Sequence, residues 1–128
     1  MRVLVDTHAF FWWLTGSRRL SASALTALEQ ESNEVLVSAV VAWELATKVR
    51  VGKWPGGEVA VNDLEQVVSE RLLTPIPITI AHARLAGSLP GVHRDPFDRV
   101  LAAQAIVEGV PLVTADPAFQ GFDVKTLW

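Results

Sequence analysis

The sequence predicts an α/β fold, a three-layer α/β/α sandwich with a short central parallel sheet. Two observations lead to this prediction. Short runs of Val, Leu and Ile, typical of strands that are buried on both faces, alternate with longer segments of helical character. Serine, threonine or aspartate stands where several of these helices are expected to begin. No repeat, linker or shift in composition divides the 128 residues, so we expect a single domain over residues 1–128.

The first half of the chain predicts two buried strands and three helices. In order, these are a strand at 2–5, a helix at 8–14, a helix at 21–31, a strand at 34–37 and a helix at 38–50. Gly16 ends the first helix, and Ser21 and Ser38 are expected to cap the next two because serine oxygens accept bonds from free backbone amides.

The second half predicts a helix at 62–72, a strand at 76–78, a helix at 79–89, a helix at 95–108, a strand at 111–114 and a weak strand at 122–126. The segment from Asn62 to Glu65 has the form of a capping box. Pro77 cannot donate to a ladder, so its strand belongs at a sheet edge. Asp95-Pro96 is a typical helix start.

Composition excludes several classes of protein. Half of the residues are hydrophobic, but no apolar run approaches the roughly 18 residues of a membrane span. No signal peptide is evident, and we expect a cytoplasmic protein without a membrane partner. The absence of cysteine excludes disulfides and zinc–thiolate sites, and three scattered histidines argue against zinc. The mean hydropathy of +0.30 predicts an interface with a subunit or partner.

Five acidic residues adjoin apolar runs and are the candidate site: Asp6, Glu44, Asp95, Asp98 and Asp116. Asp6 and Asp116 follow strands, where ligands of parallel sheets bind. Two carboxylates about 4 Å apart repel one another by roughly 4 kcal/mol at an effective dielectric near 20, so acids that converge must be neutralised by protons or by a cation. With oxygen ligands this is Mg²⁺ or Mn²⁺, which activates water for phosphodiester hydrolysis.

Each acid also has a purely structural interpretation. Asp6 fits a turn residue, and Glu44 stands four residues before Lys48, where an ion pair would form on a helix surface. Asp95 and Asp116 fit helix caps. Asp98 lies on the helix stripe that should face the sheet, so a structural role explains it less well. Asp95 ranks below the other four, because the role of helix cap is by itself sufficient to explain it.

Four segments together resemble the PIN-domain ribonucleases, and more narrowly the VapC toxins of prokaryotic toxin–antitoxin pairs. They are Val3 to His8, Ser38 to Glu44, His93 to Ala105 and Leu112 to Asp116. The resemblance implies a hydrolase with a four-acid site, carried onto Asp6, Glu44, Asp98 and Asp116, with Thr7 and Thr114 as supporting hydroxyls and Asp95 as a secondary member. It also implies Mg²⁺- or Mn²⁺-dependent cleavage of single-stranded RNA, homodimerisation, and inhibition by a cognate antitoxin.

The net charge of −3 argues against a general nucleic-acid binder. Without the site acids, however, the remaining charge is positive, and RNA phosphates have six candidate partners: Arg18, Arg19, Lys48, Arg50, Lys53 and Arg99. Ordinary solvated helix ends are the alternative. Trp12, Trp13, Trp43 and Trp54 suit base stacking or interfaces, with core packing expected for the first three.

Other functions remain as alternatives. A PIN-fold nuclease outside a toxin–antitoxin pair, acting on DNA or RNA, has the same acids, and so does a non-catalytic binding module. A haloacid-dehalogenase phosphatase requires Asp-x-Asp after the first strand, where this chain has His8 in the second position. A receiver domain requires an acidic pair there, which is also missing.

Overall fold

A computed structural model describes all residues, Met1–Trp128, and its centre is a five-stranded sheet in the order β3-β2-β1-β4-β5. All four strand pairs are parallel. The strands are β1 (Arg2–Val5), β2 (Glu34–Ser38), β3 (Thr74–Ile76), β4 (Leu112–Val113) and β5 (Thr126–Leu127). The predicted α/β class with a short parallel sheet is confirmed.

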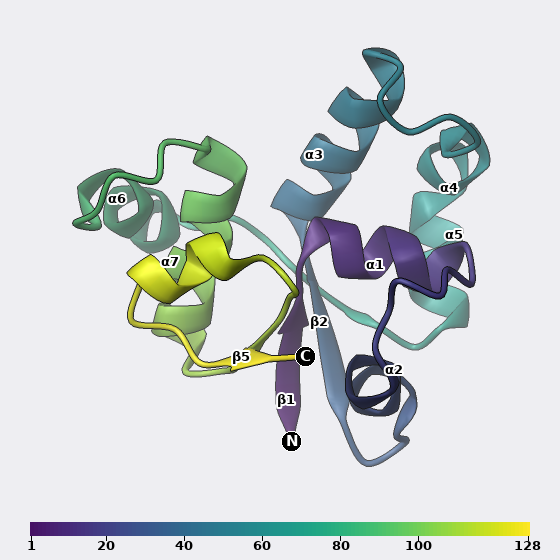
Figure 1. Cartoon of the computed structure of the whole chain (residues 1–128), viewed down its shortest axis with the longest axis horizontal. Helices are drawn as coiled ribbons and strands as arrows, with labels where there is room; N and C mark the ends of the chain where they lie inside the picture. The colour runs from purple at the N-terminus through teal and green to yellow at the C-terminus, as the bar shows by residue number, and fades with distance from the viewer.

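Helices cover both faces of the sheet (Figure 1). They are α1 (Thr7–Leu14), α2 (Ala22–Glu29), α3 (Ala39–Arg50), α4 (Glu58–Asn62), α5 (Leu64–Glu70), α6 (Ile80–Ser88) and α7 (Pro96–Glu108), followed by the 3₁₀ helix η1 (Pro117–Gly121). In Figure 1, α6 and α7 lie on one side of β1 and β2, and α1, α2, α4 and α5 lie on the other. None of these helices is both long and apolar enough to cross a membrane.

The central strand β1 forms the middle of the hydrophobic core. Val3, Leu4 and Val5 are completely buried, because helices cover both faces of this strand. Val5 pairs with Val113 of β4, and the Asp6 amide donates to the Val113 carbonyl at 3.1 Å. This register brings the carboxyl ends of β1 and β4 together, and with them the residues that follow each strand.

The predicted helix at 62–72 is wrong in its start. The chain forms α4 and α5 instead, and Asn62, the expected cap, is the last residue of α4. The residue that precedes α5 is Asp63, whose side chain makes no capping bond, so the predicted capping box does not form. Helix formation begins earlier, after the buried Gly57, where a Cβ would come within 2.7 Å of the Val49 side chain. Glycine at this position allows the chain to pack closely against Val49 of α3 just before α4 begins.

Two strands are displaced from their predicted positions. β3 occupies Thr74–Ile76 because its register against Leu36–Ser38 ends there, which leaves Pro77 outside the ladder; its predicted edge position is confirmed. β5 occupies Thr126–Leu127, later than predicted, because Phe119 and Phe122 turn into the core around η1. The second helix ends at Glu29, earlier than the predicted Glu31.

Candidate metal centre

The acidic residues lie where β1, β2 and β4 end and where α7 begins. Asp6 follows β1, Glu44 lies in α3 directly after β2, and Asp116 follows β4. Asp95 and Asp98 occupy the N-cap and the first turn of α7. Four separate segments therefore contribute carboxylates to one edge of the sheet, as expected for a parallel α/β fold.

Asp6 is almost completely buried and uses both carboxylate oxygens. Oδ1 accepts from the Ala9 amide at 2.7 Å and so caps α1, while Oδ2 accepts from the Thr114 hydroxyl. Burial raises the pKa of Asp6 to about 7, and the negative charges of Asp98 and Glu44 contribute in the same direction. The turn interpretation is thus correct but incomplete, since capping explains only one of the two oxygens.

Glu44 is also buried, with 3% of its surface exposed. Its Oε1 accepts from the Thr7 hydroxyl at 2.6 Å. No ion pair with Lys48 forms, so the alternative of a helix-surface pair is excluded. Burial raises the pKa of Glu44, and the nearby charges of Asp98 and Asp95 raise it further.

Asp95 and Asp98 meet Glu44 at the start of α7. Carboxylate oxygens of Glu44, Asp95 and Asp98 all lie within 4.8 Å of one another. Asp95 is at the same time the predicted helix cap, since its Oδ1 accepts from the amides of Phe97 at 2.9 Å and Asp98 at 3.3 Å. The tightest group of acids therefore includes Asp95, which the sequence ranked below the other four.

Asp116 lies at the margin of this group. It is half-buried, and its Oδ1 accepts from the Ala118 amide at 2.9 Å to cap η1. Its negative charge is one of the causes that raise the pKa of Asp98, after burial and the charge of Asp95. Asp116 thus contributes to the electric field of the site, although its oxygens lie outside the tight group.

The donor set fits a hard divalent cation. It consists of carboxylate oxygens with neighbouring threonine hydroxyls, and no cysteine is present in the chain. Oxygen ligands favour Mg²⁺ or Mn²⁺ over softer metals. Burial raises the pKa of Asp6, Glu44 and Asp98, because their ionised forms lose solvation and the positive charge near them does not fully compensate. A bound cation would supply that charge.

The basic residues predicted to hold phosphates differ in their environments. Arg18, Arg19, Arg50 and Lys53 are exposed, and Lys48 is half-buried and close enough to His8 to lower the pKa of its imidazole, after burial itself. Arg99 is different. Its guanidinium donates to the backbone carbonyls of Ala86, Leu89 and His93, so three of its N–H donors are engaged within the chain, and RNA binding by Arg99 stays a prediction.

Trp43 also departs from expectation. Trp13 is buried, as predicted, but 58% of Trp43 is exposed. The indole packs edge-on against Phe97, with ring centroids 4.7 Å apart. Because Trp43 precedes Glu44 and Phe97 precedes Asp98, this aromatic pair adjoins the acids.

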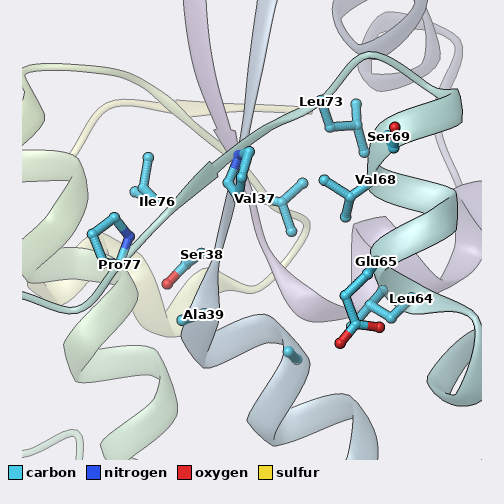
Figure 2. A pocket seen from close by; sticks show the side chains of 12 residues that line it. Val37, Ser38, Ala39, Leu64, Glu65, Val68, Ser69, Leu73, Ile76 and Pro77 are labelled. Atoms are coloured by element: carbon cyan, nitrogen blue, oxygen red, sulfur yellow. The ribbon is translucent and has the colours of Figure 1, made fainter.

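A separate apolar groove of about 730 Å³ lies between α5, β3 and the start of α3 (Figure 2). Figure 2 shows Leu64, Val68 and Leu73 on one side and Ile76 and Pro77 on the other. None of the five site acids lines it. The groove is therefore distinct from the acidic centre.

Comparison with known proteins gives a consistent result. Residues 3–125 match the PIN domain family model. Ribonuclease VapC22 of Mycobacterium tuberculosis (strain ATCC 25618 / H37Rv) is 33% identical over 116 residues, which cover 89% of this chain and 86% of that protein.

Solved structures share the fold at lower identity. VapBC2 of Rickettsia felis, bound to a promoter DNA fragment, has a TM-score of 0.72 at 21% identity, covering 98% of this chain and 97% of that one. VapC20 of Mycobacterium tuberculosis, described as a sarcin-ricin loop cleaving toxin, has a TM-score of 0.67 at 17% identity, covering 94% and 95%.

Sequence reasoning missed one contact at the site. The Nε2 atom of His93 lies 2.8 Å from Oδ2 of Asp98. The sequence shows that His93 is near the acids, but it does not show where the side chain points, because four residues of loop and helix start lie between His93 and Asp98.

Proposed function

Because this chain belongs to the PIN domain family, we propose that it is a divalent-metal-dependent endoribonuclease that hydrolyses phosphodiester bonds in single-stranded RNA and acts as the toxin of a toxin–antitoxin pair. The observation that carries the proposal is the group formed by the buried Glu44 of α3 with the half-buried Asp95 and Asp98 at the start of α7, next to which the buried Asp6 follows β1 and contributes its charge. Such a cluster is costly to maintain in a fold unless a cation binds there.

We propose that the metal would be held by Asp6, Glu44, Asp98 and Asp116, with Asp95 as an additional ligand. Of these, Glu44, Asp95 and Asp98 form the tight group, and Asp6 and Asp116 lie outside it. When bound, Mg²⁺ or Mn²⁺ would supply the positive charge needed to activate a water and to stabilise phosphate oxygens. The protein then requires no nucleophilic serine or cysteine of its own, in agreement with the absence of cysteine from the chain.

Two threonines keep the carboxylates in place. The Thr7 hydroxyl donates to Glu44, and the Thr114 hydroxyl donates to Asp6 across the β1–β4 register. Each hydroxyl holds one oxygen of its carboxylate in place. Because the carboxylate is planar, the direction of its second oxygen is then constrained as well. Hydrogen bonds of this kind tune and orient metal ligands.

The proposed substrate is supported by the relatives and by the surface. Two similar proteins are described as a ribonuclease and as a sarcin-ricin loop cleaving toxin. On this chain the exposed Arg18, Arg19, Arg50 and Lys53, together with Lys48, offer positive charge to phosphates. In this proposal the protein acts on RNA and binds its antitoxin in the prokaryotic cytoplasm.

We also propose an antitoxin partner and a homodimer. Structural neighbours include VapBC complexes, which are assemblies of a toxin with its antitoxin. Several large apolar side chains of this chain are exposed, among them Leu72, Ile80 and Val92. Large apolar side chains on a protein surface are typical of an interface with a partner. A partner bound there would also restrain a toxic activity.

The decisive experiment is cleavage of single-stranded RNA by the purified protein with Mg²⁺ or Mn²⁺ and with EDTA. Cleavage is expected only with metal, and Asp6→Asn and Asp98→Asn should each reduce it by at least about a hundredfold, because each removes a metal-binding charge. Asp123→Asn, which removes an exposed acid, is the matched control.

Two outcomes would contradict the proposal. Equal cleavage by the parent and both site variants would show that the acids are not the catalytic centre. Equal cleavage of single-stranded DNA of the same sequence would place the protein among nucleases that do not depend on the 2′-hydroxyl. Growth arrest on expression, absent in Asp98→Asn and relieved by the antitoxin, tests the toxin role.

A further inference from the structure

Arg99 ties together the loop between α6 and α7. Its Nε donates to the Ala86 carbonyl at 2.8 Å, its Nη1 to the His93 carbonyl at 2.9 Å, and its Nη2 to the Leu89 carbonyl at 2.5 Å. One guanidinium thus joins the end of α6 to the residue that begins the approach to α7. A rigid fork with several donors is the property that distinguishes arginine from lysine.

The side chain of His93 turns from this loop toward the acids. Its Nε2 lies 2.8 Å from Oδ2 of Asp98, and because an ionised carboxylate only accepts hydrogen bonds, the imidazole donates. The two side chains are 27% and 15% exposed, so water competes little for the bond. The imidazole lies near the ring of Phe122, with centroids 5.9 Å apart, and the Arg99 guanidinium covers the same ring at 5.8 Å.

From these contacts we propose that His93 is a positioning residue for the Asp98 carboxylate and that Arg99 holds His93 in the orientation it requires. The inference rests on the proposed function, in which Asp98 binds metal. Asp98 is surrounded by the like charges of Asp95 and Asp116, which would turn its carboxylate away from them. The hydrogen bond from His93 fixes Oδ2 of Asp98, so Oδ1 of the same carboxylate keeps a defined direction.

This arrangement differs from a simple loop anchor. Arg99 alone would suffice to hold the loop, since it contacts three carbonyls. The imidazole makes no hydrogen bond to the loop and contacts the site acid instead. Partners that hydrogen-bond to metal ligands typically change metal affinity or activity by about ten- to a hundredfold when they are removed.

The test is a titration of the metal-free full-length protein with Mn²⁺, in which calorimetry measures the binding. His93→Leu removes the donor and is expected to weaken Mn²⁺ binding by about tenfold or more. His93→Gln places an amide N–H at a similar distance and should restore most of the affinity. His93→Asn carries the same amide on a shorter side chain, so it should behave like His93→Leu.

Folding and charge are controlled separately. Circular dichroism and the melting temperature establish whether each variant is folded. If His93→Leu is not folded, the comparison of His93→Gln with His93→Asn tests the role of His93. Arg94→Gln changes the charge of an exposed neighbour and should leave Mn²⁺ affinity within about twofold of the parent. In RNA cleavage, His93→Asn should lower kcat without raising KM for the RNA, because it alters the metal site rather than RNA binding.

The results separate this inference from the proposed function. A parent protein that binds no Mn²⁺ would overturn the proposed function and this inference with it. A parent that binds Mn²⁺ while folded His93→Asn and His93→Leu bind it equally well would overturn the role of His93 alone. Arg99→Lys should weaken Mn²⁺ binding severalfold; parent-like affinity, or loss of the fold, would remove Arg99 from the proposal.

Discussion

Asp6 combines a structural role with the proposed chemical one. One oxygen caps α1 through the Ala9 amide, and the other accepts from Thr114, a residue 108 positions away in the chain. Capping alone would be satisfied by an exposed aspartate or serine. The burial of this carboxylate among other acids therefore indicates a role beyond helix initiation.

The raised pKa of Asp6 predicts how stability depends on pH in EDTA. The folded-state value of about 7 lies above the ordinary value of 3.8, so the folded state holds a proton that the unfolded state has released. The free energy of unfolding should therefore fall as pH rises from about 4 to about 7, and level off above pH 7. Asp6 alone contributes a slope of up to ~1.4 kcal/mol per pH unit.

Urea denaturation in EDTA at several pH values measures this slope. Asp6→Asn keeps the cap but cannot titrate, so its slope should be smaller and its stability at pH 7.5 higher than that of the parent. Glu44 and Asp98, whose pKa values are also raised, should leave part of the slope in the variant. Identical slopes for Asp6→Asn and the parent would contradict the prediction.

Trp43 is the aromatic residue best placed to contact RNA. Its indole is exposed, is held by Phe97 and lies next to Glu44 in sequence. Stacking of a base on an aromatic ring contributes about 1–3 kcal/mol, so Trp43→Leu should weaken RNA binding by about tenfold. Trp43→Phe should retain most of the affinity.

Fluorescence anisotropy with a labelled RNA in the Asp98→Asn background measures binding without cleavage. Hydrolysis of a small phosphodiester that carries no base should be unchanged by Trp43→Leu in the otherwise unaltered protein. If light scattering instead shows that Trp43→Leu alters the oligomeric state while RNA affinity stays constant, Trp43 belongs to a subunit interface.

At the scale of elements, the start of α7 combines a helix cap with the acidic centre. Asp95 caps the helix through the amides of Phe97 and Asp98, and its carboxylate also lies within the tight acidic group. Pro96 at the first helical position fixes the backbone so that the Asp98 side chain follows one turn later. The geometry of a helix start therefore sets the spacing of two of the acids.

Two substitutions separate these roles of Asp95. Asp95→Asn keeps a good cap and removes the charge, whereas Asp95→Ala removes both. If Asp95 is a ligand, both variants should bind Mn²⁺ at least about tenfold more weakly, while only Asp95→Ala should lose roughly 1 kcal/mol of stability in EDTA. Parent-like Mn²⁺ affinity in Asp95→Asn would restrict Asp95 to the cap.

At the scale of the whole molecule, the acidic centre joins segments from both ends of the chain. Asp6 lies in the first tenth of the sequence and Asp116 in the last tenth, and β1 and β4 hold them at one edge. A cation bound there would link β1, α3 and α7. Metal binding should therefore stabilise the fold as a whole.

Thermal unfolding with increasing Mn²⁺ tests this linkage. At a concentration of 100 times Kd, binding adds about 2.7 kcal/mol to the free energy of unfolding, and the melting temperature should rise by several degrees. EDTA should reverse the rise, and Asp98→Asn should show much less of it, whereas Asp123→Asn should match the parent. A melting temperature independent of Mn²⁺ would contradict a metal centre at this position.

The sequence by itself determined the features that depend on neighbouring residues. Ser21, Ser38 and Asp95 cap helices where predicted, because a side-chain oxygen reaches amides only two or three residues ahead. The alternation of apolar runs and helices predicted the parallel sheet, and the acids after β1 and β4 predicted the edge at which the site lies. These signals are local, and packing leaves them intact.

Only the tertiary structure decided the features that depend on distant contacts. The register of β1 against β4 brings Thr114 to Asp6, α4 extends through Asn62 so that the predicted capping box does not form, and the turn of the loop before α7 aims His93 at Asp98. Arg99 looked like a phosphate ligand in the sequence, but three nearby carbonyls occupy its guanidinium. The spacing of residues along a chain indicates which side chains are candidates for a site, and packing determines which of them come into contact.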